Sequence, residues 1–599
     1  MTYTPATHDQ LLAIRVNAGI EELAQSERFA AAEPDMVEAI VSGIGEFAAG
    51  EWAPLNRVGD LEGARLENGT VHLPDGFAEA YEHYVEQGWN AIAGPVEFGG
   101  QGLPFTLSCN VLENLGTANM AFNLLPMLSV GAMESLEHHG SKELQEKYLP
   151  KLVSGEWSGT MNLTEPQAGS DVGARRTTAH PIEDGEHAGK YRIKGQKIYI
   201  TWGEHNVADN IVHLVLARTP DAPAGTKGIS LFVVPKMLPG ADGNFTVRND
   251  LRCVGLEDKL GIHASPTCTM SYGDNDECVG FLVGEEMAGM RAMFTMMNHA
   301  RVNVGLQGVS IAERAYQQAL QYAKERVQSA KIGAATRDPV AIVEHADVRR
   351  MLMTMKATTE AMRALAYANA AAVDRAHALD AGSEEQRAAQ GRADLLTPVT
   401  KAWCTDMGVE MASLGIQVHG GMGYVEETGA AQHYRDARIA AIYEGTNGIQ
   451  ALDLVGRKLN MAGGAHWRAL CEEMRAGLEA LPGEGDFGVM GPPLSRAISA
   501  FERGAEWLTG SGRDANDPAA GATPFCRLAG ITIGASLLAA QALEAKRRLD
   551  AGEGDPAFLK AKIATARFFA EQILPQAAAL LPTVTAGEDA LYEIGVEEL

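Results

Sequence analysis

The stretch AAIYEGTNGIQ, residues 440–450, places a single carboxylate, Glu444, between an apolar strip and a Gly-Thr-Asn-Gly turn. A side chain that removes a proton from carbon must be held in position and desolvated enough to be basic. Ile442 and Tyr443 would supply an apolar wall, and Gly445 would let the backbone approach a ligand closely. Taken alone, the segment also fits a surface glutamate near a helix N-terminus, where the helix dipole favours negative charge.

Three further segments accompany it in chain order: MNLTEPQAGSD (161–171), KGQKIYITWG (194–203) and IQVHGGMGY (416–424). Together with the Glu444 segment they resemble the acyl-CoA dehydrogenase family, over roughly residues 81–459. The chain of 599 residues continues well beyond that region and is similar to an extended subclass of the family. That subclass includes long- and medium-chain fatty acyl-CoA enzymes and 3-methylthiopropionyl-CoA dehydrogenases.

Composition and charge narrow the class of protein. A content of 46% hydrophobic and 21% charged residues is ordinary for a soluble globular protein, and the length allows three or four domains. The net charge of -27 disfavours binding to nucleic acid or to an anionic membrane surface. The phosphates of an acyl-CoA or of FAD would therefore need local cationic or amide-rich pockets.

The seven cysteines are scattered, with no C-x-x-C pair. This pattern argues against a disulfide scaffold and against a zinc site, so no metal is predicted, and it fits a reducing compartment. The N-terminus lacks a basic region followed by an apolar core, so no signal peptide is expected. The apolar stretch 528–543 is too short to span a bilayer and is predicted to be a buried helix. We therefore expect a cytoplasmic protein without stable membrane insertion.

Hydrophobic periodicity divides the chain into four parts. Residues 1–157 are predicted to be helical, with one helix ending at Pro150, and residues 158–284 alternate as short strands. Helical periodicity returns over 285–460. The tail, 461–599, has Gly/Pro-rich breaks at 481–493 and 509–524 and two predicted helices after them. The fold class is mainly α with an inserted β-domain. The resemblance implies a small β-barrel there, a four-helix bundle after it and an extra helical domain in the tail.

The resemblance implies FAD as the cofactor. By position, Met161, Leu163 and Thr164 match residues that lie along the flavin, and Ser170 matches one shared by the flavin and the CoA side of the substrate. Hydroxyl groups suit this role because they can donate to flavin ring atoms and to phosphate oxygens. Without the family, the segment shows only a turn rich in Thr, Pro and Gly.

Tyr199, Ile200 and Thr201 match a strand that packs on the flavin and hydrogen-bonds to it. Many members have tryptophan at the first of these positions, whereas here Trp202 follows Thr201. Which ring stacks on the flavin is therefore open. The alternative is an ordinary half-buried strand.

Arg326 and Gln328 match a turn whose arginine reaches the FAD pyrophosphate of a partner subunit. A guanidinium can bind phosphate with two parallel hydrogen bonds. The family usually has an aromatic residue and a glycine after this arginine, whereas Ser329 and Ala330 stand nearby here. A solvated arginine at a helix end is the alternative.

Gln417, Gly420 and Gly421 match a turn that approaches the adenine-side phosphates of the neighbour's FAD. Paired glycines let main-chain amides come close to an anion. After Glu444, Thr446 matches a hydroxyl that binds the flavin pyrophosphate, and Asn447 lies beside it.

Substrate contacts are implied for Asn298, which matches a residue that touches CoA, for Arg301, which buttresses the base, and for Ser170 and Gly445. In a minority of the family the base comes just before this arginine. Ala300 stands there and cannot accept a proton, so Glu444 is the candidate base.

The resemblance thus implies an FAD-dependent acyl-CoA dehydrogenase of fatty acid β-oxidation. Glu444 would remove the α-proton, hydride would pass to flavin N5, and electrons would leave to an electron-transfer flavoprotein. An acyl-CoA oxidase using oxygen is the alternative, and a non-catalytic acyl-CoA-binding homologue would have lost the base. No residue fixes the acyl chain. We expect a homodimer in which the tail docks on the surface that shorter members use to form tetramers.

Overall fold

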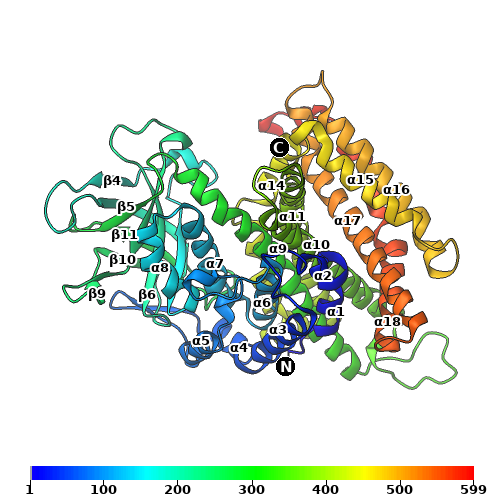
Figure 1. Ribbon diagram of the computed structural model, residues 1–599. Coiled ribbons are helices and arrows are strands. Elements are labelled where there is room, and N and C mark those ends of the chain that lie inside the picture. The colour runs from blue at the N-terminus through cyan, green and yellow to red at the C-terminus, as the bar shows by residue number, and fades with distance from the viewer. Residues whose placement is uncertain (1–2) are drawn as a thin grey trace.

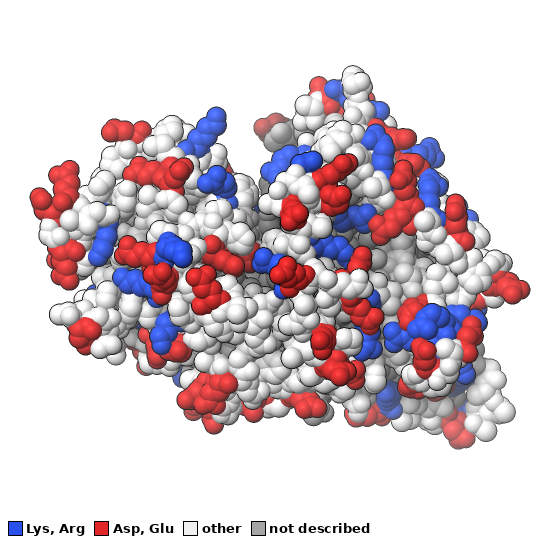
Figure 2. All heavy atoms as spheres, in the orientation of Figure 1, with Lys and Arg blue, Asp and Glu red and all other residues white. Residues whose placement is uncertain are grey.

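The computed structural model describes residues 3–599, which form an elongated molecule with the β-domain at one side and long helices in the centre (Figure 1). The C-terminal helices α15 to α18 line the opposite side, and the N-terminal helices pack at the base. Figure 2 shows acidic and basic side chains interspersed over this face, which is hollowed between the β-domain and the C-terminal helices.

The N-terminal part is mostly helical. Its elements are α1 (Thr7–Ala13), α2 (Ile20–Leu23), α3 (Pro34–Phe47), α4 (Leu55–Glu62), the hairpin β1 (Arg65–Glu67) and β2 (Thr70–His72), α5 (Phe77–Glu86), α6 (Phe105–Ala118), α7 (Met120–His139) and α8 (Lys142–Ser154). Gly19, with a φ of 63°, separates α2 from the π-helical turn (Ile14–Ala18) that continues α1. Helices α6 and α7 are buried along most of their length and contact the central helices.

The middle part is a curled β-sheet. Its strands, with the small β8–β9 hairpin, are β3 (Trp157–Asn162), β4 (Thr178–Pro181), β5 (Tyr191–Thr201), β6 (Asn210–Ala217), β7 (Ser230–Pro235), β8 (Met237–Pro239), β9 (Phe245–Arg248), β10 (Leu251–Leu256), β11 (Thr267–Tyr272) and β12 (Val279–Val283). The strand order is β10-β11-β5-β12-β7-β6-β3, with β4 paired to β5. The end strand β3 turns back to β5, and the Thr160 hydroxyl donates to the Thr201 carbonyl at 2.7 Å.

The central helices are α9 (Gly289–Glu325), α10 (Ala346–Ala378), α11 (Glu384–His419), α12 (Gly421–Tyr424), α13 (Ala430–Ala437) and α14 (Asn447–Asp453). Glycines allow α9 and α11 to pack closely. A Cβ at Gly308 would lie 2.1 Å from the Cys404 carbonyl oxygen, and one at Gly305 would lie 2.8 Å from the Thr400 side chain. Both contacts exclude a larger side chain without movement of the helices.

The C-terminal addition consists of α15 (Ala465–Glu479), α16 (Gly485–Thr509), α17 (Asn516–Ala551), α18 (Pro556–Phe568), α19 (Pro575–Val584) and α20 (Asp589–Tyr592). Helix α17 packs on α10, α11 and α14. The fully buried ring of Trp403 on α11 fits against Gly530 and Gly534 of α17, where added Cβ atoms would lie 2.2 and 3.0 Å from the indole. The addition therefore docks on the central helices through a close backbone contact.

A network of buried charges also joins the addition to the rest of the chain. Lys562 of α18 binds Glu360 of α10 at 2.6 Å and also pairs with Asp9 of α1. Arg363, one turn along α10, pairs with Asp9 and binds Glu113 of α6 at 2.7 Å. Since each buried charge has an opposite partner, the network can persist away from water.

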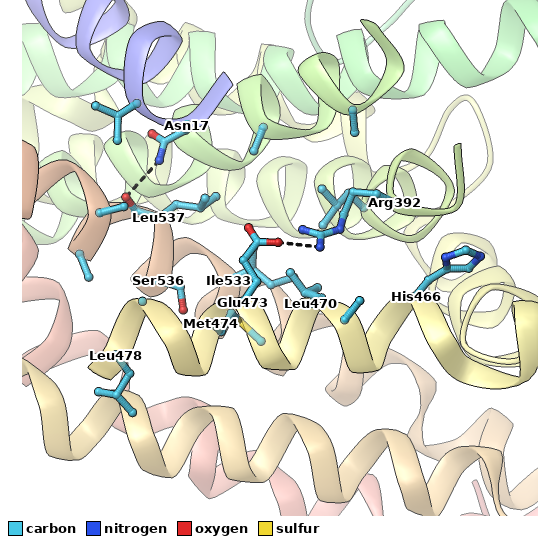
Figure 3. A pocket seen from close by; sticks show the side chains of 18 of the residues that line it. Asn17, Arg392, His466, Leu470, Glu473, Met474, Leu478, Ile533, Ser536 and Leu537 are labelled. Atoms are coloured by element: carbon cyan, nitrogen blue, oxygen red, sulfur yellow. Dashed lines mark hydrogen bonds and ion pairs between the residues drawn. The ribbon is translucent and has the colours of Figure 1, made fainter. Parts of the chain in front are cut away.

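The docking leaves a cavity of about 610 Å³ between the addition, α10, α11 and the first π-helical turn (Figure 3). Arg392 of α11 binds Glu473 of α15 at 2.7 Å across it, and the Asn17 amide donates to the Leu537 carbonyl at 3.2 Å. None of the predicted catalytic, cofactor or substrate residues lines this cavity.

Several local predictions are wrong. Helix α8 continues through Pro150 to Ser154, because Pro150 is exposed and the carbonyl that loses its partner can bind water. Most of the break predicted at 481–493 lies inside α16, whose Pro492 is likewise exposed. Helix α17 begins at Asn516, inside the second predicted break. The β1–β2 hairpin also falls in a part predicted to be helical.

The apolar stretch 528–543 was predicted to be too short to span a bilayer, and this prediction is also wrong. Helix α17 has 36 residues and a window of mean hydropathy 1.4, so by length and composition alone it could cross a membrane. In the structure 72% of that window is buried against other parts of the chain, as expected for a core helix. Such a helix is weak evidence for a membrane span.

Candidate active site

Glu444 lies in the short loop between the 3₁₀ turn Arg438–Ala441 and α14. Its φ is 56°, in the left-handed region that is costly for a residue with a Cβ. The next residue, Gly445, has a φ of 87°, and a Cβ there would lie 2.7 Å from the Gln450 amide nitrogen. The Glu444 carbonyl accepts from the Gln450 amide at 3.3 Å and from the Arg301 guanidinium at 3.5 Å. This strained turn is therefore held from α9 and α14.

The surroundings of the Glu444 carboxyl make this group more basic than a glutamate in water. Burial raises its pKa above the ordinary glutamate value, and the charges of Arg301 and Lys401 act in the opposite direction. Neither cation lies within 4.0 Å of the carboxylate, and residues 3–599 provide no other ion pair to it. Burial also lowers the pKa of Lys401 to about 8, while Glu444 and Asp406 raise it. The carboxylate is therefore desolvated but not neutralised by direct pairing.

The turn after Glu444 is anchored to α11. The Asn447 side chain accepts from Lys401 at 2.8 Å and donates to Asp406 at 2.6 Å. The Thr446 hydroxyl caps α14 by accepting from the Ile449 amide at 3.3 Å. These contacts give Asn447 a positioning role. The predicted cofactor contacts of Thr446 and Asn447 stay predictions.

The two segments predicted to meet the flavin lie side by side. The Ile198 amide donates to the Thr164 carbonyl at 3.0 Å, next to the contact between Thr160 and Thr201 described above. Met161 and Ile200 are buried, Leu163 is half-buried and Ser170 is exposed in the following loop.

Tyr199 and Trp202 differ in a way that bears on which ring can stack on a cofactor. Tyr199 is 59% exposed, whereas Trp202 is fully buried. The Trp202 indole donates to the Ala121 carbonyl at 3.3 Å and stacks on Phe122. Trp202 is thus committed to the core, and only Tyr199 presents a free ring.

The remaining predicted residues divide between two places. Asn298 is exposed on α9, one turn before the half-buried Arg301. Arg326 follows Arg301 by 25 residues at the end of the same helix, which at 1.5 Å per residue is about 37 Å along the axis. Arg326 and Gln328 contact each other at 3.3 Å and are exposed.

Gln417, Gly420 and Gly421 lie at the same end of the bundle as Arg326. His419 of α11 stacks on Tyr322 of α9 with ring centroids 4.5 Å apart. All three predicted residues are exposed, and nothing lies within 4 Å of a Cβ added to either glycine. The structure therefore brings these residues together with Arg326 but does not bring them to Glu444.

The chain is similar along its length to known protein families. Models of the acyl-CoA dehydrogenase N-terminal, middle and C-terminal domains match residues 35–156, 160–275 and 287–459, and a model described as acetyl-CoA dehydrogenase C-terminal like matches 470–595. A 3-methylmercaptopropionyl-CoA dehydrogenase of Ruegeria pomeroyi is 47% identical over 99% of both chains. The chain belongs to the acyl-CoA dehydrogenase family.

Two further proteins show how far the likeness extends. The broad-specificity linear acyl-CoA dehydrogenase FadE5 of Mycobacterium tuberculosis is 32% identical over 96% of both chains. The structure of an acyl-CoA dehydrogenase from Bacillus anthracis complexed with FAD has a TM-score of 0.73 at 21% identity, covering 94% of this chain and 90% of that one. Since 94% of this chain is covered, the shared fold extends into the C-terminal addition.

FAD is the cofactor of this acyl-CoA dehydrogenase, and its residues fit the group. The exposed ring of Tyr199 offers an apolar surface, and the half-buried Thr164 and Thr201 lie on the two segments that meet there through the bond between the Ile198 amide and the Thr164 carbonyl. Near Glu444, Ile442 is 49% exposed, and the buried side-chain amide oxygen (Oε1) of Gln450 has no hydrogen-bond partner in the described chain. An exposed apolar edge next to unsatisfied polar groups is typical of a ligand site.

Sequence reasoning missed Lys401, Gln450 and Gln307 as parts of the site. Gln307 accepts a hydrogen bond from the Tyr443 hydroxyl, and so ties the residue before Glu444 to α9. Lys401 could have been noticed as a lone charge in the apolar run LLTPVTKAWC, which calls for a partner when buried. Nothing in the sequence shows that it donates to Asn447 and that its charge acts on Glu444.

Proposed function

We propose that the enzyme removes the α-proton of an acyl-CoA thioester with the Glu444 carboxylate and forms a trans-2-enoyl-CoA. The observation that carries this proposal is the carboxyl whose pKa is raised by burial without a direct ion pair. Such a carboxylate is more basic than one in water. Ala300, at the alternative position of the base, is buried and has no titratable group.

The main chain of Glu444 supports the same chemistry. Its N–H makes no hydrogen bond to other groups in the described chain and is free to donate to a thioester carbonyl. A donor placed there would stabilise the charge that develops on that oxygen as the proton leaves. FAD, when bound, supplies the hydride acceptor at flavin N5.

Two substrate classes compete for this site. The identity of 47% to a protein named 3-methylmercaptopropionyl-CoA dehydrogenase supports that thioester, and the likeness to FadE5 supports linear fatty acyl-CoA. Anaerobic titration of the FAD-loaded enzyme with both thioesters, monitored by loss of flavin absorbance, separates them. In steady-state assays with the two thioesters, we expect the methylthio substrate to give the higher kcat/KM. Bleaching by neither would overturn the proposal.

Electrons are proposed to pass to an electron-transfer flavoprotein. The alternative is an oxidase, in which oxygen reaches the reduced flavin. The enzyme is first reduced by substrate without oxygen and then mixed with either acceptor. Reoxidation by electron-transfer flavoprotein at least 100-fold faster than by air-saturated buffer is expected, and the reverse order would establish the oxidase.

We also propose a cytoplasmic homodimer in which Arg326, Gln328 and the Gln417 to Gly421 turn meet the FAD of the neighbouring subunit. Their distance from Glu444 along α9 and their exposure support this arrangement. Arg326→Ala should lower FAD retention and dimer mass together, because cofactor and interface are linked. Light scattering and the ratio of absorbance at 450 to 280 nm test it. A tetramer, or unchanged retention and mass in the variant, would contradict it.

A further inference from the structure

A second cluster of polar side chains lies where α7, α9 and α10 meet, and it includes no residue of the proposed active site. Glu134 and His138 are one turn apart on α7, His299 is on α9, and His377 is near the end of α10. One ligating atom each from Glu134, His138 and His377 lies within 4.8 Å of the others. The three residues come from two helices separated by more than 200 residues of sequence, so their convergence is a property of the fold.

His299 adds an independent observation. It is 6% exposed, and its Nδ1 lies 3.4 Å from the Glu134 carboxylate in an orientation that makes no hydrogen bond. A buried nitrogen without a hydrogen bond is costly unless something else binds it. The imidazole rings of His299 and His138 both lie about 6 Å from that of His377, with centroid distances of 6.1 and 5.9 Å.

The cluster has the chemistry of a metal site. His299 is buried and His377 is half-buried, and each offers an imidazole nitrogen, which is the commonest side-chain ligand of transition-metal ions. His138 is already oriented by a 3.1 Å hydrogen bond between its Nδ1 and the Glu134 carbonyl. In metal sites, a hydrogen bond made by one ring nitrogen of a histidine orients the other nitrogen toward the metal.

The space and the charge also suit a cation. The four side chains line a cavity of about 40 Å³, which is room for one ion with a water molecule. Arg28 lines the same cavity, but the carboxylates of Glu134 and Glu137 outnumber it. Neighbouring His139 binds Thr295 at 2.8 Å and is already satisfied.

We propose that Glu134, His138 and His377, with His299 as a fourth ligand, bind one divalent transition-metal ion of the zinc class. Imidazole nitrogens with one carboxylate oxygen are ligands that Zn²⁺ takes at about 2.0–2.2 Å in a tetrahedral arrangement. That geometry places neighbouring ligand atoms about 3.4 Å apart, so the side chains close by roughly 1 Å on binding. The ion ties α7 to α10 at the start of α9, two residues before Arg301. Cysteine spacing could not reveal this site because it contains no cysteine.

The test uses the full-length, FAD-loaded enzyme freed of metal by a chelator. Zinc chloride is titrated by calorimetry, and bound metal is counted by mass spectrometry after dialysis. One zinc per chain is expected for the wild type and for His180→Ala, which removes an exposed histidine on β4. His377→Ala and Glu134→Gln should each weaken zinc binding at least tenfold while keeping flavin content and circular dichroism.

Thermal unfolding provides a second measurement. Zinc should raise the melting temperature of the wild type but not that of His377→Ala, because only a competent site links binding to stability. If His377→Ala does not fold, His138→Ala replaces it, since His138 is the most exposed of the four. No zinc bound per wild-type chain, or equal binding by wild type and ligand variants, would overturn the proposal.

Discussion

Glu113 is fully buried and Glu444 is half-buried, and the surroundings of the two carboxylates differ further. Glu113 has no exposed surface, binds Arg363 at 2.7 Å and accepts from the Tyr367 hydroxyl, on a regular helix. Glu444 has no ion pair within 4.0 Å in the described chain and stands on a strained left-handed backbone. A buried carboxylate that is fully paired holds helices together, whereas one that is desolvated and left unpaired keeps its basicity for chemistry.

The strongest test of this comparison replaces each carboxylate by its amide. Glu444→Gln should lower kcat by about 10³- to 10⁴-fold, because the base is lost, while the flavin stays bound and the unfolding free energy changes little. Steady-state kinetics with the best thioester of the panel and denaturant unfolding measure the two effects.

Glu113→Gln is the matched control. It weakens the charged hydrogen bonds that Glu113 makes with Arg363 and Tyr367, while Asp9 and Glu313 stay paired with Arg363. We expect a cost of about 1.5–3 kcal/mol of stability, with near-normal kcat in the protein that remains folded. A variant Glu444→Gln with near-normal turnover would refute the assignment of the base. A loss of turnover in Glu113→Gln without a loss of stability would refute the contrast.

The second region for comparison is the contact between Trp403 and α17. Gly530→Ala places a Cβ 2.2 Å from the indole and should cost about 1–3 kcal/mol by overpacking. Gly477→Ala is its control in the same addition, because nothing lies within 4 Å of a Cβ there and the residue is in helix α15. It should stabilise by about 0.5–1 kcal/mol. Chemical denaturation checks both, and equal effects would show that the addition does not depend on this contact.

The sequence was most informative where the chemistry is local. Glu444, Gly445 and Thr446 are consecutive, so one short segment contains the proposed base, a glycine with a left-handed backbone and the residue that caps α14. The family resemblance of this segment predicted both the fold class, which is confirmed, and the base, which stays a prediction. Lys401 could not be predicted as a neighbour of Glu444, because the 42 residues between them bring Glu444 back to α11 only in the folded chain.

The predictions of helix ends at prolines were wrong because they, too, depend on the folded structure. The covalent structure of proline predicts a helix end at Pro150 and a break that includes Pro492. Whether a helix survives a proline depends on which face it occupies, and both are exposed, so water can satisfy the freed carbonyls. The His299 and His377 cluster escaped notice because its members are on different helices, none with a local motif.

The smallest expected effect concerns Lys401, the cation near Glu444. Its charge lowers the pKa of the base, opposing the rise caused by burial. Lys401→Gln removes that charge but keeps an N–H that can donate to Asn447. The pKa of Glu444 should therefore rise further, and the acidic limb of the kcat/KM profile should move to higher pH. Below this limb Glu444 is protonated and the rate falls.

The pH range of the measurement follows from Lys401 itself. Since burial lowers the pKa of Lys401 to about 8, the wild type loses this charge in alkaline solution. Lys401 is therefore charged on the acidic limb, so the two profiles should differ there and should merge at higher pH, where Glu444 is ionised in both proteins. Lys458→Gln, which removes a lysine paired with Asp394 at 3.0 Å, is the control and should leave the limb in place. A shift of the acidic limb to lower pH in Lys401→Gln would mean that Lys401 does not act on Glu444 through its charge.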